Sequence, residues 1–227
     1  MAEGTLAFSL KKPAGFIFKA GQTADLTLVD PPETDSEGNT RTFSIASAPT
    51  ENELVFATRL RDTAFKRSLR NMKPGTKIKV DGPMGSFNLH KNAAKPAVFL
   101  AGGIGITPFR SIIREAAQQN DPHQIYLFYS NRRPEDAAFM DELQTIPRQN
   151  PNFHLIPTMA EMDKSQQGWT GERGFIDAAM LKRHLPELAG PIFYTAGPPA
   201  MVAAMKDMLV KAGVDEDDVR AEDFPGY

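Results

Sequence analysis

The residues best suited to bind an anion form a glycine loop, Gly102-Gly103-Ile104-Gly105-Ile106-Thr107-Pro108, between an apolar run and a helical pattern. Glycines let the backbone approach a ligand closely, and a helix N-terminus presents free N–H groups. Thr107 is placed to cap the helix, and Pro108 stands where proline is favoured at the first helical position. The loop predicts a dinucleotide pyrophosphate site; a tight turn without a ligand is the alternative.

A second turn, Ala196-Gly197-Pro198-Pro199, also joins a strand-like run to a helical pattern. The carboxyl ends of parallel strands line one crevice of a doubly wound sheet. We therefore expect Gly197 and Pro198 to face the same nucleotide as the first loop.

The end of the second strand of this half departs from the ordinary GxGxxG dehydrogenase pattern. That pattern places an acidic residue there to hold a ribose. Here the residues are Ser130-Asn131-Arg132, and Ser130 and Arg132 become candidate nucleotide contacts.

In the first half, Arg41-Thr42-Phe43-Ser44 combines a cation, an aromatic ring and hydroxyl groups. Side chains alternate along a strand, so Arg41 and Phe43 share one face. A guanidinium suits a phosphate, and the ring offers a stacking surface for a flat heterocycle. Taken alone, these four residues favour a barrel strand with a core phenylalanine and a surface arginine.

Taken together, the motifs resemble the ferredoxin–NADP reductase family. Its motifs are R-x-[Y/F]-S, G-P-x-G, G-G-x-G-x-x-P, C-G-P and a terminal E-x-aromatic. They match, in order and over essentially the whole chain, Arg41 to Ser44, Gly82-Pro83-Met84-Gly85, Gly102 to Pro108, Gly197-Pro198 and Glu222-Asp223-Phe224.

The resemblance implies an FAD site in the first half. Arg41 would pair with the FAD pyrophosphate, Phe43 would stack on the flavin, and Ser44 would hydrogen-bond near flavin N5, with Thr42 in the same strand. The backbone of Thr58 and Arg59 would border the ring. The segment Thr63-Ala64-Phe65-Lys66 would open a short helix onto the FAD phosphates, which favours FAD over FMN.

The second half would bind the nicotinamide nucleotide. Gly102, Gly103, Gly105 and Thr107 would hold its pyrophosphate. Glu222 and Phe224 would lie at the nicotinamide site as candidate catalytic residues with Ser44, and Phe224 would cover the flavin until nicotinamide displaces it. Tyr227 is the alternative covering ring.

Three departures from the family stand out. Ala196 replaces the frequent cysteine beside the nicotinamide, Phe43 lacks the hydroxyl of the usual tyrosine, and Gly226-Tyr227 extend past the end of plant-type members. Because hydride passes directly from nicotinamide C4 to flavin N5, no thiol chemistry is lost.

Nucleotide preference is predicted from the residues after the third strand. Plant-type members place a Ser-Arg pair there for the 2′-phosphate of NADPH, whereas this chain has Ala160 and Glu161. A carboxylate repels phosphate and accepts hydrogen bonds from a ribose diol, so Glu161 favours NADH. Arg132 and Arg173 argue for NADPH.

Periodicity divides the chain into residues 1–93 and 94–227. Short strand-like runs broken by turn residues predict an antiparallel β-barrel, which the resemblance makes six-stranded and FAD-binding. From residue 96, strands alternate with helical patterns, which predicts an α/β doubly wound parallel sheet binding NAD(P). Pro134 is expected to open a helix carrying Phe139, Leu143 and Ile146.

Composition excludes several function classes. A net charge of −2 gives no electrostatic footprint for nucleic acid or an anionic membrane. With no cysteine there is no disulfide, thiolate nucleophile or Cys-ligated metal, and the four scattered histidines suggest no metal site. No apolar run is long enough to span a bilayer, and no signal-peptide pattern opens the chain, so we expect a cytoplasmic protein.

These inferences predict an enzyme: a flavoprotein oxidoreductase moving hydride from NADH or NADPH to FAD. The electrons would pass to a separate acceptor, a ferredoxin, a flavodoxin or an oxygenase component. A reductase of free flavin or ferric chelates is one alternative. A non-catalytic regulatory subunit is another, against which the intact Arg41–Ser44 and Gly102–Pro108 segments argue.

Overall fold

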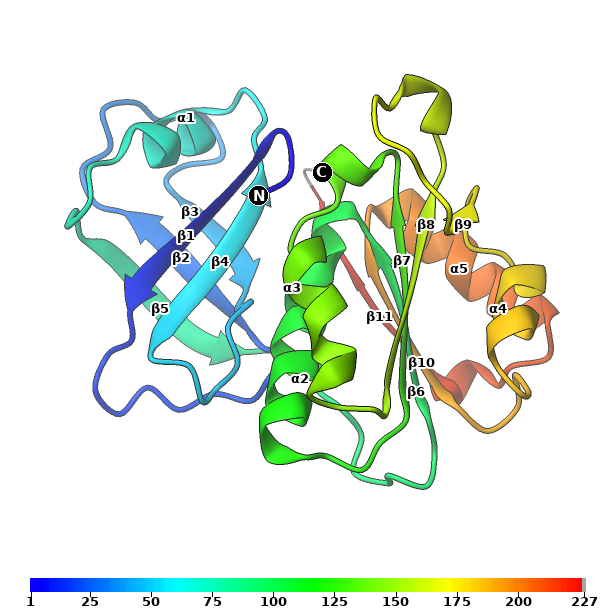
Figure 1. Ribbon diagram of the computed structural model, residues 1–227. Coiled ribbons are helices and arrows are strands. Elements are labelled where there is room, and N and C mark those ends of the chain that lie inside the picture. The colour runs from blue at the N-terminus through cyan, green and yellow to red at the C-terminus, as the bar shows by residue number, and fades with distance from the viewer. Residues whose placement is uncertain (226–227) are drawn as a thin grey trace.

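A computed structural model describes residues 1–225. Its N-terminal half is built from antiparallel strands in two small sheets (Figure 1). One sheet pairs β1 (Thr5–Lys11) with β4 (Glu53–Arg59), and the other has the order β3-β2-β5. The second sheet comprises β2 (Thr23–Leu28), β3 (Thr40–Ser44) and β5 (Ile78–Met84). The short helix α1 (Ala64–Asn71) packs Phe65 and Leu69 against this half.

The C-terminal half holds a six-stranded parallel sheet with the order β11-β10-β6-β7-β8-β9. The strands are β6 (Ala97–Gly102), β7 (Ile125–Asn131), β8 (Phe153–Met159), β9 (Glu172–Arg173), β10 (Ile192–Gly197) and β11 (Val219–Asp223). Chain order reverses between β6 and β10, and in open α/β sheets ligands bind beside such a reversal. The central strands β6 and β10 are buried throughout.

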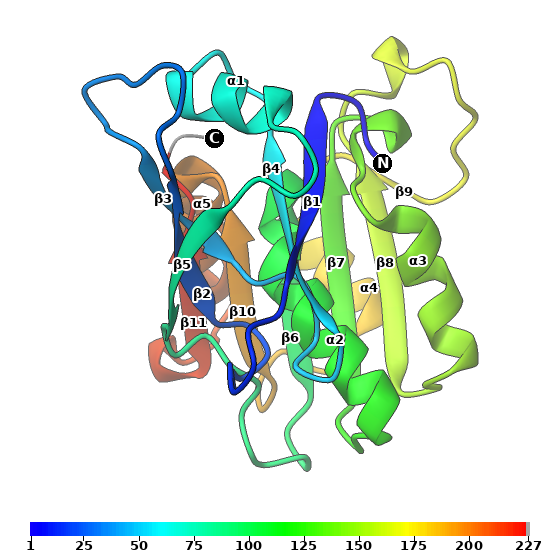
Figure 2. The same cartoon turned by 90° about the vertical axis from the view of Figure 1, so that its left-hand side faces the viewer.

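Helices cover both faces of this sheet (Figures 1 and 2). They are α2 (Ile106–Gln119), α3 (Met140–Thr145), α4 (Ala178–His184) and α5 (Pro199–Lys211). The core under α2 and α3 also contains Ala20, Ala57 and Phe87 from the N-terminal half, so α2 lies between the sheet and the barrel strands. The core under α4 and α5 contains Met205 and Leu209.

The fold class is confirmed, with three local corrections. The N-terminal half has five strands in two sheets among the described residues, and not six, because the chain after β5 leaves the sheets and packs Phe87 against Phe109 of α2. The helix expected from Pro134 is broken: a 3-10 turn at Pro134–Asp136 precedes α3, because Phe139 adopts a left-handed backbone (φ 59°). Thr107 does not cap α2, because it lies within the first turn of that helix.

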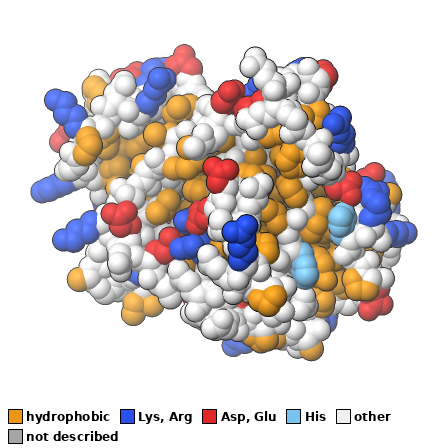
Figure 3. All heavy atoms as spheres, in the orientation of Figure 1, with side chains coloured by type: hydrophobic (Ala, Val, Ile, Leu, Met, Phe, Trp, Pro, Cys, Tyr) orange, Lys and Arg blue, Asp and Glu red, His pale blue; other side chains and the backbone are white. Residues whose placement is uncertain are grey.

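The molecular surface mixes charges of both signs with apolar side chains on the face seen in Figure 3. In the described part of the chain, no helix combines the length and the hydropathy that a membrane crossing requires.

Candidate nucleotide and flavin sites

The two glycine turns lie against each other at the carboxyl ends of β6 and β10. A Cβ on Gly197, whose φ is +153°, would lie 3.1 Å from the Gly102 carbonyl oxygen. A Cβ on Gly105 would lie 2.2 Å from the Ala196 carbonyl oxygen. Gly105 has no room for a side chain, and Gly197 combines a tight contact with a backbone conformation that favours glycine, so the two backbone segments meet at one place.

The helix after the first loop begins two residues earlier than expected, at Ile106 instead of Pro108. A 3-10 turn, Gly103–Gly105, runs directly into α2, and no side chain caps the helix. Thr107 is buried within the first turn, where its hydroxyl donates a hydrogen bond to the Ile104 carbonyl at 3.1 Å. Without a capping side chain, the N-terminal end of α2 keeps its positive dipole end available to an anion.

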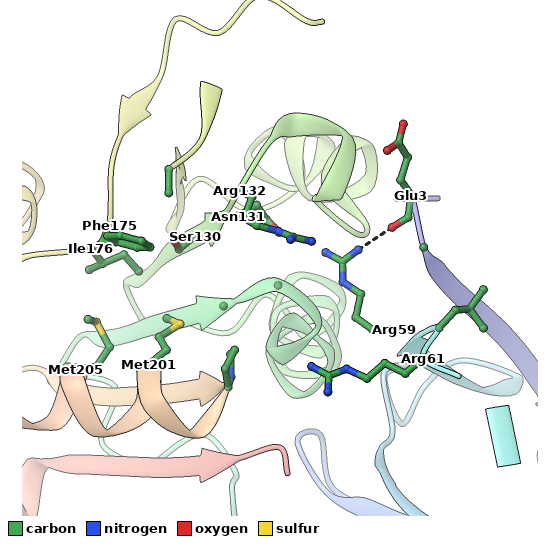
Figure 4. Close-up of a pocket in the computed structure, with 16 residues that line it drawn as sticks. Glu3, Arg59, Arg61, Ser130, Asn131, Arg132, Phe175, Ile176, Met201 and Met205 are labelled. Carbon is green, nitrogen blue, oxygen red and sulfur yellow. Dashed lines mark hydrogen bonds between the residues drawn. The ribbon is translucent and has the colours of Figure 1, made fainter. Parts of the chain in front are cut away.

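A cavity of about 510 Å³ opens beside these turns (Figure 4). It is lined from the sheet by Gly102, Gly103, Ser130, Asn131, Arg132, Ala160 and Pro198, from α5 and its surroundings by Met201, Met205, Phe175 and Ile176, and from the N-terminal half by Glu3, Gly4, Arg59, Leu60 and Arg61. Ser130 and Arg132 lie in it as predicted. A volume of this size is typical of a ligand pocket, and the lining residues suit a ligand with apolar and charged parts.

Three arginines border this cavity from both halves. Arg59 donates to the backbone oxygens of Glu3, at 2.7 Å, and Asp136, at 2.6 Å, and so bridges the halves. Arg132 is 66% exposed, 3.8 Å from Asp136. Arg61 extends from the N-terminal half beside the cavity (Figure 4). The cavity therefore combines an apolar wall with cationic groups, the chemistry that a dinucleotide requires.

The predicted phosphate site of the barrel half is held by carboxylates of the chain itself. Asp35 accepts a hydrogen bond from the Ala64 N–H at 3.2 Å, in the first turn of α1. The same carboxylate lies 3.5 Å from Arg41, whose guanidinium also pairs with Glu37 at 2.7 Å. The two oxygens of this carboxylate occupy positions where phosphate oxygens could lie, and the phosphate-binding role of Arg41 and the helix end stays a prediction.

The helix itself opens as the sequence predicts. The Thr63 hydroxyl caps α1 by accepting from the Lys66 N–H, while Phe65 turns into the core. Partial burial lowers the pKa of Lys66, so its ammonium gains from a nearby phosphate.

Phe43 and Ser44 occupy different environments. The Phe43 ring packs 5.9 Å from Phe65 and 6.3 Å from Phe56 and remains partly exposed, so its role in flavin stacking stays a prediction. Ser44 is 6% exposed, and its hydroxyl has no hydrogen-bond partner among residues 1–225. A buried, unpaired hydroxyl is costly unless a ligand satisfies it, which fits a hydrogen bond to flavin. Nearby, Thr58 is buried, and its hydroxyl donates to the Arg59 carbonyl.

The C-terminal residues return to the glycine turns. Glu222 pairs with Ala196 in the β10–β11 ladder, and the Phe224 N–H donates to the Gly197 carbonyl at 3.0 Å. Burial, and secondarily Asp223, raises the pKa of Glu222 to about 7. One Glu222 oxygen has no hydrogen-bond partner within the described chain. Phe224 packs on the core beneath α2, whereas Gly226 and Tyr227, and with them the alternative covering ring, lie outside the described residues.

Glu161 follows β8 as counted from the sequence. Its N–H donates to the Arg132 carbonyl at 2.8 Å, and its carboxylate pairs with Lys164 at 2.7 Å, which lowers the pKa of Glu161. Its neighbour Ala160 lines the cavity. Arg173 donates to the Trp169 carbonyl and is not among the cavity residues, so of the two arginines that argue for NADPH only Arg132 lines the cavity.

Sequence reasoning missed the cavity's apolar wall and its N-terminal rim. Phe175 is 77% exposed beside the cavity, and Glu3 and Arg61 reach it from the other half. An isolated phenylalanine after a glycine carries no sequence signal for a site. The position of the N-terminus depends on tertiary contacts such as that between Glu3 and Arg133.

Comparison with known proteins agrees with this geometry. Residues 99–207 match the family model described as an oxidoreductase NAD-binding domain. The chain is 31% identical over 223 residues to the glycine betaine monooxygenase reductase subunit of Chromohalobacter salexigens, covering 97% of this chain and 60% of that protein. These matches agree with the resemblance to ferredoxin–NADP reductase-type oxidoreductases that the sequence motifs indicate.

Two further similarities agree with this resemblance. Over 218 residues the chain is 28% identical to the reductase component of propane 2-monooxygenase from Rhodococcus jostii, covering 94% of this chain and 57% of that one. The FAD/NAD-binding domain of nitric oxide dioxygenase from Vibrio cholerae superposes with a TM-score of 0.84 at 21% identity, covering 98% and 93% of the two chains. This last likeness shows the fold. The chain spans 60% or less of the length of the two curated relatives.

Proposed function

We propose that the chain is an FAD-dependent NAD(P)H oxidoreductase that takes hydride from the nicotinamide nucleotide and passes electrons to a separate acceptor. The observation that carries this proposal is the cavity at the paired glycine turns, which is completed by Arg59 and Arg61 of the barrel half. A nucleotide bound along Gly102 and Gly103 lies against the half that carries Arg41, Phe43 and Ser44.

The residues of the barrel half fit FAD. Arg41 and the N-terminal end of α1 each contact one oxygen of the Asp35 carboxylate, and the buried Ser44 hydroxyl is unpaired within residues 1–225. FAD, when bound, would accept the hydride with its two electrons and can release electrons one at a time. The protein's share is to bind both cofactors, orient them and exclude water.

Glu222 contributes a buried carboxyl group whose pKa is raised to about 7, so that it stays protonated at lower pH. Its protonated form adds no charge beside the nicotinamide site, and it can donate a hydrogen bond. With Phe224 against Gly197, the C-terminal strand closes the edge of the site formed by the two glycine turns.

The acceptor belongs to a redox partner with its own cofactor. The chain has no cysteine, so a cysteine-ligated iron–sulfur centre must be on another polypeptide or domain. The two monooxygenase relatives are named as a reductase subunit and a reductase component, which supports a ferredoxin or oxygenase component as the acceptor. We place the reaction in the cytoplasm, where NADH is available, and propose NADH as the preferred donor because of Glu161.

Asp35 and Glu37 favour a second candidate, a reductase of free flavin or ferric chelates. Their carboxylates compete with a flavin phosphate for Arg41 and α1, which weakens flavin binding. A competing carboxylate has no such effect on the nucleotide cavity.

Purification followed by an acceptor panel separates these functions. The electron-transfer proposal predicts that FAD stays bound through gel filtration, that heat releases FAD and not FMN, and that NADH reduces a ferredoxin or an oxygenase component faster than free flavin. Release of FMN would overturn the FAD assignment. Loss of flavin on the column, with free flavin as the best acceptor, would support the second candidate.

A further inference from the structure

One buried cation joins the two halves of the molecule. The Arg110 side chain, in α2, is only 8% exposed. Its Nη1 donates to the Ala46 carbonyl at 2.6 Å and lies 3.3 Å from a Glu51 carboxylate oxygen, both in the barrel half. Its Nε and Nη2 donate to Glu142 of α3 at 2.8 and 2.9 Å. The guanidinium is therefore held from both sides of the domain junction.

Further bonds continue this connection along α2. The Ser111 hydroxyl donates to the Ser47 carbonyl at 2.6 Å, and Thr50 hydrogen-bonds to Gln118. Glu51 also accepts a hydrogen bond from the Ala48 N–H at 2.5 Å, which stabilises the loop that contains both residues. One face of α2 is thus bonded to a single short segment of the barrel half, residues 46–51.

The two ends of this connection lie next to the two cofactor sites along the chain. Ala46 lies shortly after Ser44, which is the last residue of the strand expected to meet the flavin. Arg110 lies in α2, whose N-terminal turn follows the glycine loop expected to hold the nucleotide. A shift of α2 along the 46–51 segment would move that loop relative to Ser44.

We propose that Arg110 is a positioning residue that sets the distance between nicotinamide and flavin. This inference rests on the proposed function. Hydride transfer requires the reacting atoms to be about 3–3.5 Å apart, and an error of about 1 Å can cost about 100-fold in rate. An ion pair that only stabilised the fold would change the unfolding temperature and leave the reduction rate per bound flavin unchanged.

Two matched variants test this role in the FAD-loaded protein. Glu51→Gln removes the charge that holds Arg110 from the barrel half, whereas Glu142→Gln removes its partner within the nucleotide half. The two carboxylates are 20% and 26% exposed, and each also pairs with Arg114, at 3.8 and 3.3 Å, so the two variants lose the same kinds of partner and differ in the half of the molecule that carries the carboxylate. Arg110→Lys is the third variant, which keeps the charge but cannot reproduce the fork of hydrogen bonds.

The rate of flavin reduction is measured anaerobically at saturating NADH. The long-wavelength nicotinamide–flavin absorbance band, the affinity for NADH and the unfolding temperature are measured for each variant as well. Glu51→Gln and Arg110→Lys should slow the limiting rate about tenfold or more and weaken the absorbance band, because the rings no longer meet correctly. NADH affinity should stay within about twofold, and Glu142→Gln should reduce flavin within about twofold of the wild-type rate.

Wild-type rates in Glu51→Gln and Arg110→Lys, with a lower unfolding temperature alone, would overturn the positioning role. An equal slowing in Glu142→Gln would overturn it as well, because the effect would then not depend on the link between the halves. A wild-type protein whose flavin NADH does not reduce contradicts the proposed function itself, an outcome distinct from both.

Discussion

The carboxylate of Asp35 accepts a hydrogen bond from the Ala64 N–H, 3.2 Å away, and lies 3.5 Å from the guanidinium of Arg41. A phosphate at this helix end must displace it or be repelled by it. We expect Asp35→Asn to bind FAD about two- to fivefold more tightly, since one charge at a helix terminus contributes up to about 1 kcal/mol. Titration of the flavin-free protein with FAD measures the change.

Glu33→Gln is the matched control for this prediction. Glu33 lies in the same loop but pairs with Arg67 on the outer side of α1, so its loss should leave FAD affinity unchanged. If Asp35→Asn binds FAD no more tightly than Glu33→Gln, Asp35 does not compete with the cofactor.

Removal of Arg41 should have the opposite effect. Arg41→Ala should weaken FAD binding by more than about tenfold, because a charged hydrogen-bond partner of a phosphate contributes about 1.5–3 kcal/mol. The control is Arg67→Ala, which removes an arginine of α1 that pairs with Glu33 and Asp62. Equal flavin occupancy in the two purified variants would contradict the role given to Arg41.

The parallel sheet could be predicted because β6, β7 and β8 are apolar runs and α2 and α5 carry apolar residues at helical spacing. The edge strands could not: β9 is Glu172-Arg173, and β11 carries Arg220, Glu222 and Asp223. Such short, charged strands are set by pairing with a formed sheet rather than by their own pattern. The strand β5 alternates correctly at Ile78 and Val80 but ends in Gly82-Pro83, which suggests a turn.

The candidate site divides in the same way. Gly102, Gly105 and Gly197 could be singled out from the sequence because glycine turns between a strand and a helix are a recognisable pattern, although the contacts that exclude a Cβ at each come from Met201, Ala196 and Gly102 of the chain itself. The contacts of Asp35 with Ala64 and of Arg110 with Ala46 could not, because each joins segments far apart in the sequence and the loop carrying Asp35 has no periodic pattern.

The C-terminal segment offers a third test. Phe224 is anchored to Gly197 by its N–H and packs on the core beneath α2. Deletion of residues 224–227 should open the nicotinamide site and tighten nucleotide binding several-fold, because an intramolecular ring no longer competes for the flavin face. Difference spectra during NAD⁺ titration report both affinity and stacking. A truncated protein with the affinity and flavin spectrum of the full chain would refute this role.

Glu222 makes stability depend on pH. Burial raises its pKa to about 7 in the folded protein, from about 4.3 when unfolded. The stability that this pKa difference adds to the folded protein is fully present below the unfolded pKa, and it is lost as pH rises through about 7. From pH 5 to pH 8 the free energy of unfolding should therefore fall by on the order of 2 kcal/mol more in the wild type than in Glu222→Gln.

Urea unfolding at both pH values measures this difference, with Glu216→Gln as the control. Glu216 is exposed in a 3-10 turn of the same C-terminal region, and its variant should follow the wild-type pH dependence. Parallel profiles for the wild type and Glu222→Gln would show that Glu222 is not the group responsible.

Nucleotide preference provides a fifth prediction. NADH should be preferred, since the Glu161 carboxylate follows Ala160 at the edge of the cavity and repels a 2′-phosphate. Glu161→Arg should move the ratio of kcat/KM for NADPH over NADH upward by about tenfold or more, because it replaces repulsion by a charged hydrogen bond. Asp163→Arg, two residues away in an exposed 3-10 turn, introduces the same charge change as a control. An unchanged ratio in Glu161→Arg would place Glu161 away from the ribose.

The most direct test of the central claim is anaerobic mixing of the FAD-loaded protein with NADH deuterated at C4, followed at the flavin absorption band. Direct hydride transfer predicts that the band bleaches in a single saturable phase and that deuteration slows this phase. The reduced protein should then return to the oxidised spectrum on addition of a one-electron acceptor. A flavin band that NADH leaves unchanged would contradict the account.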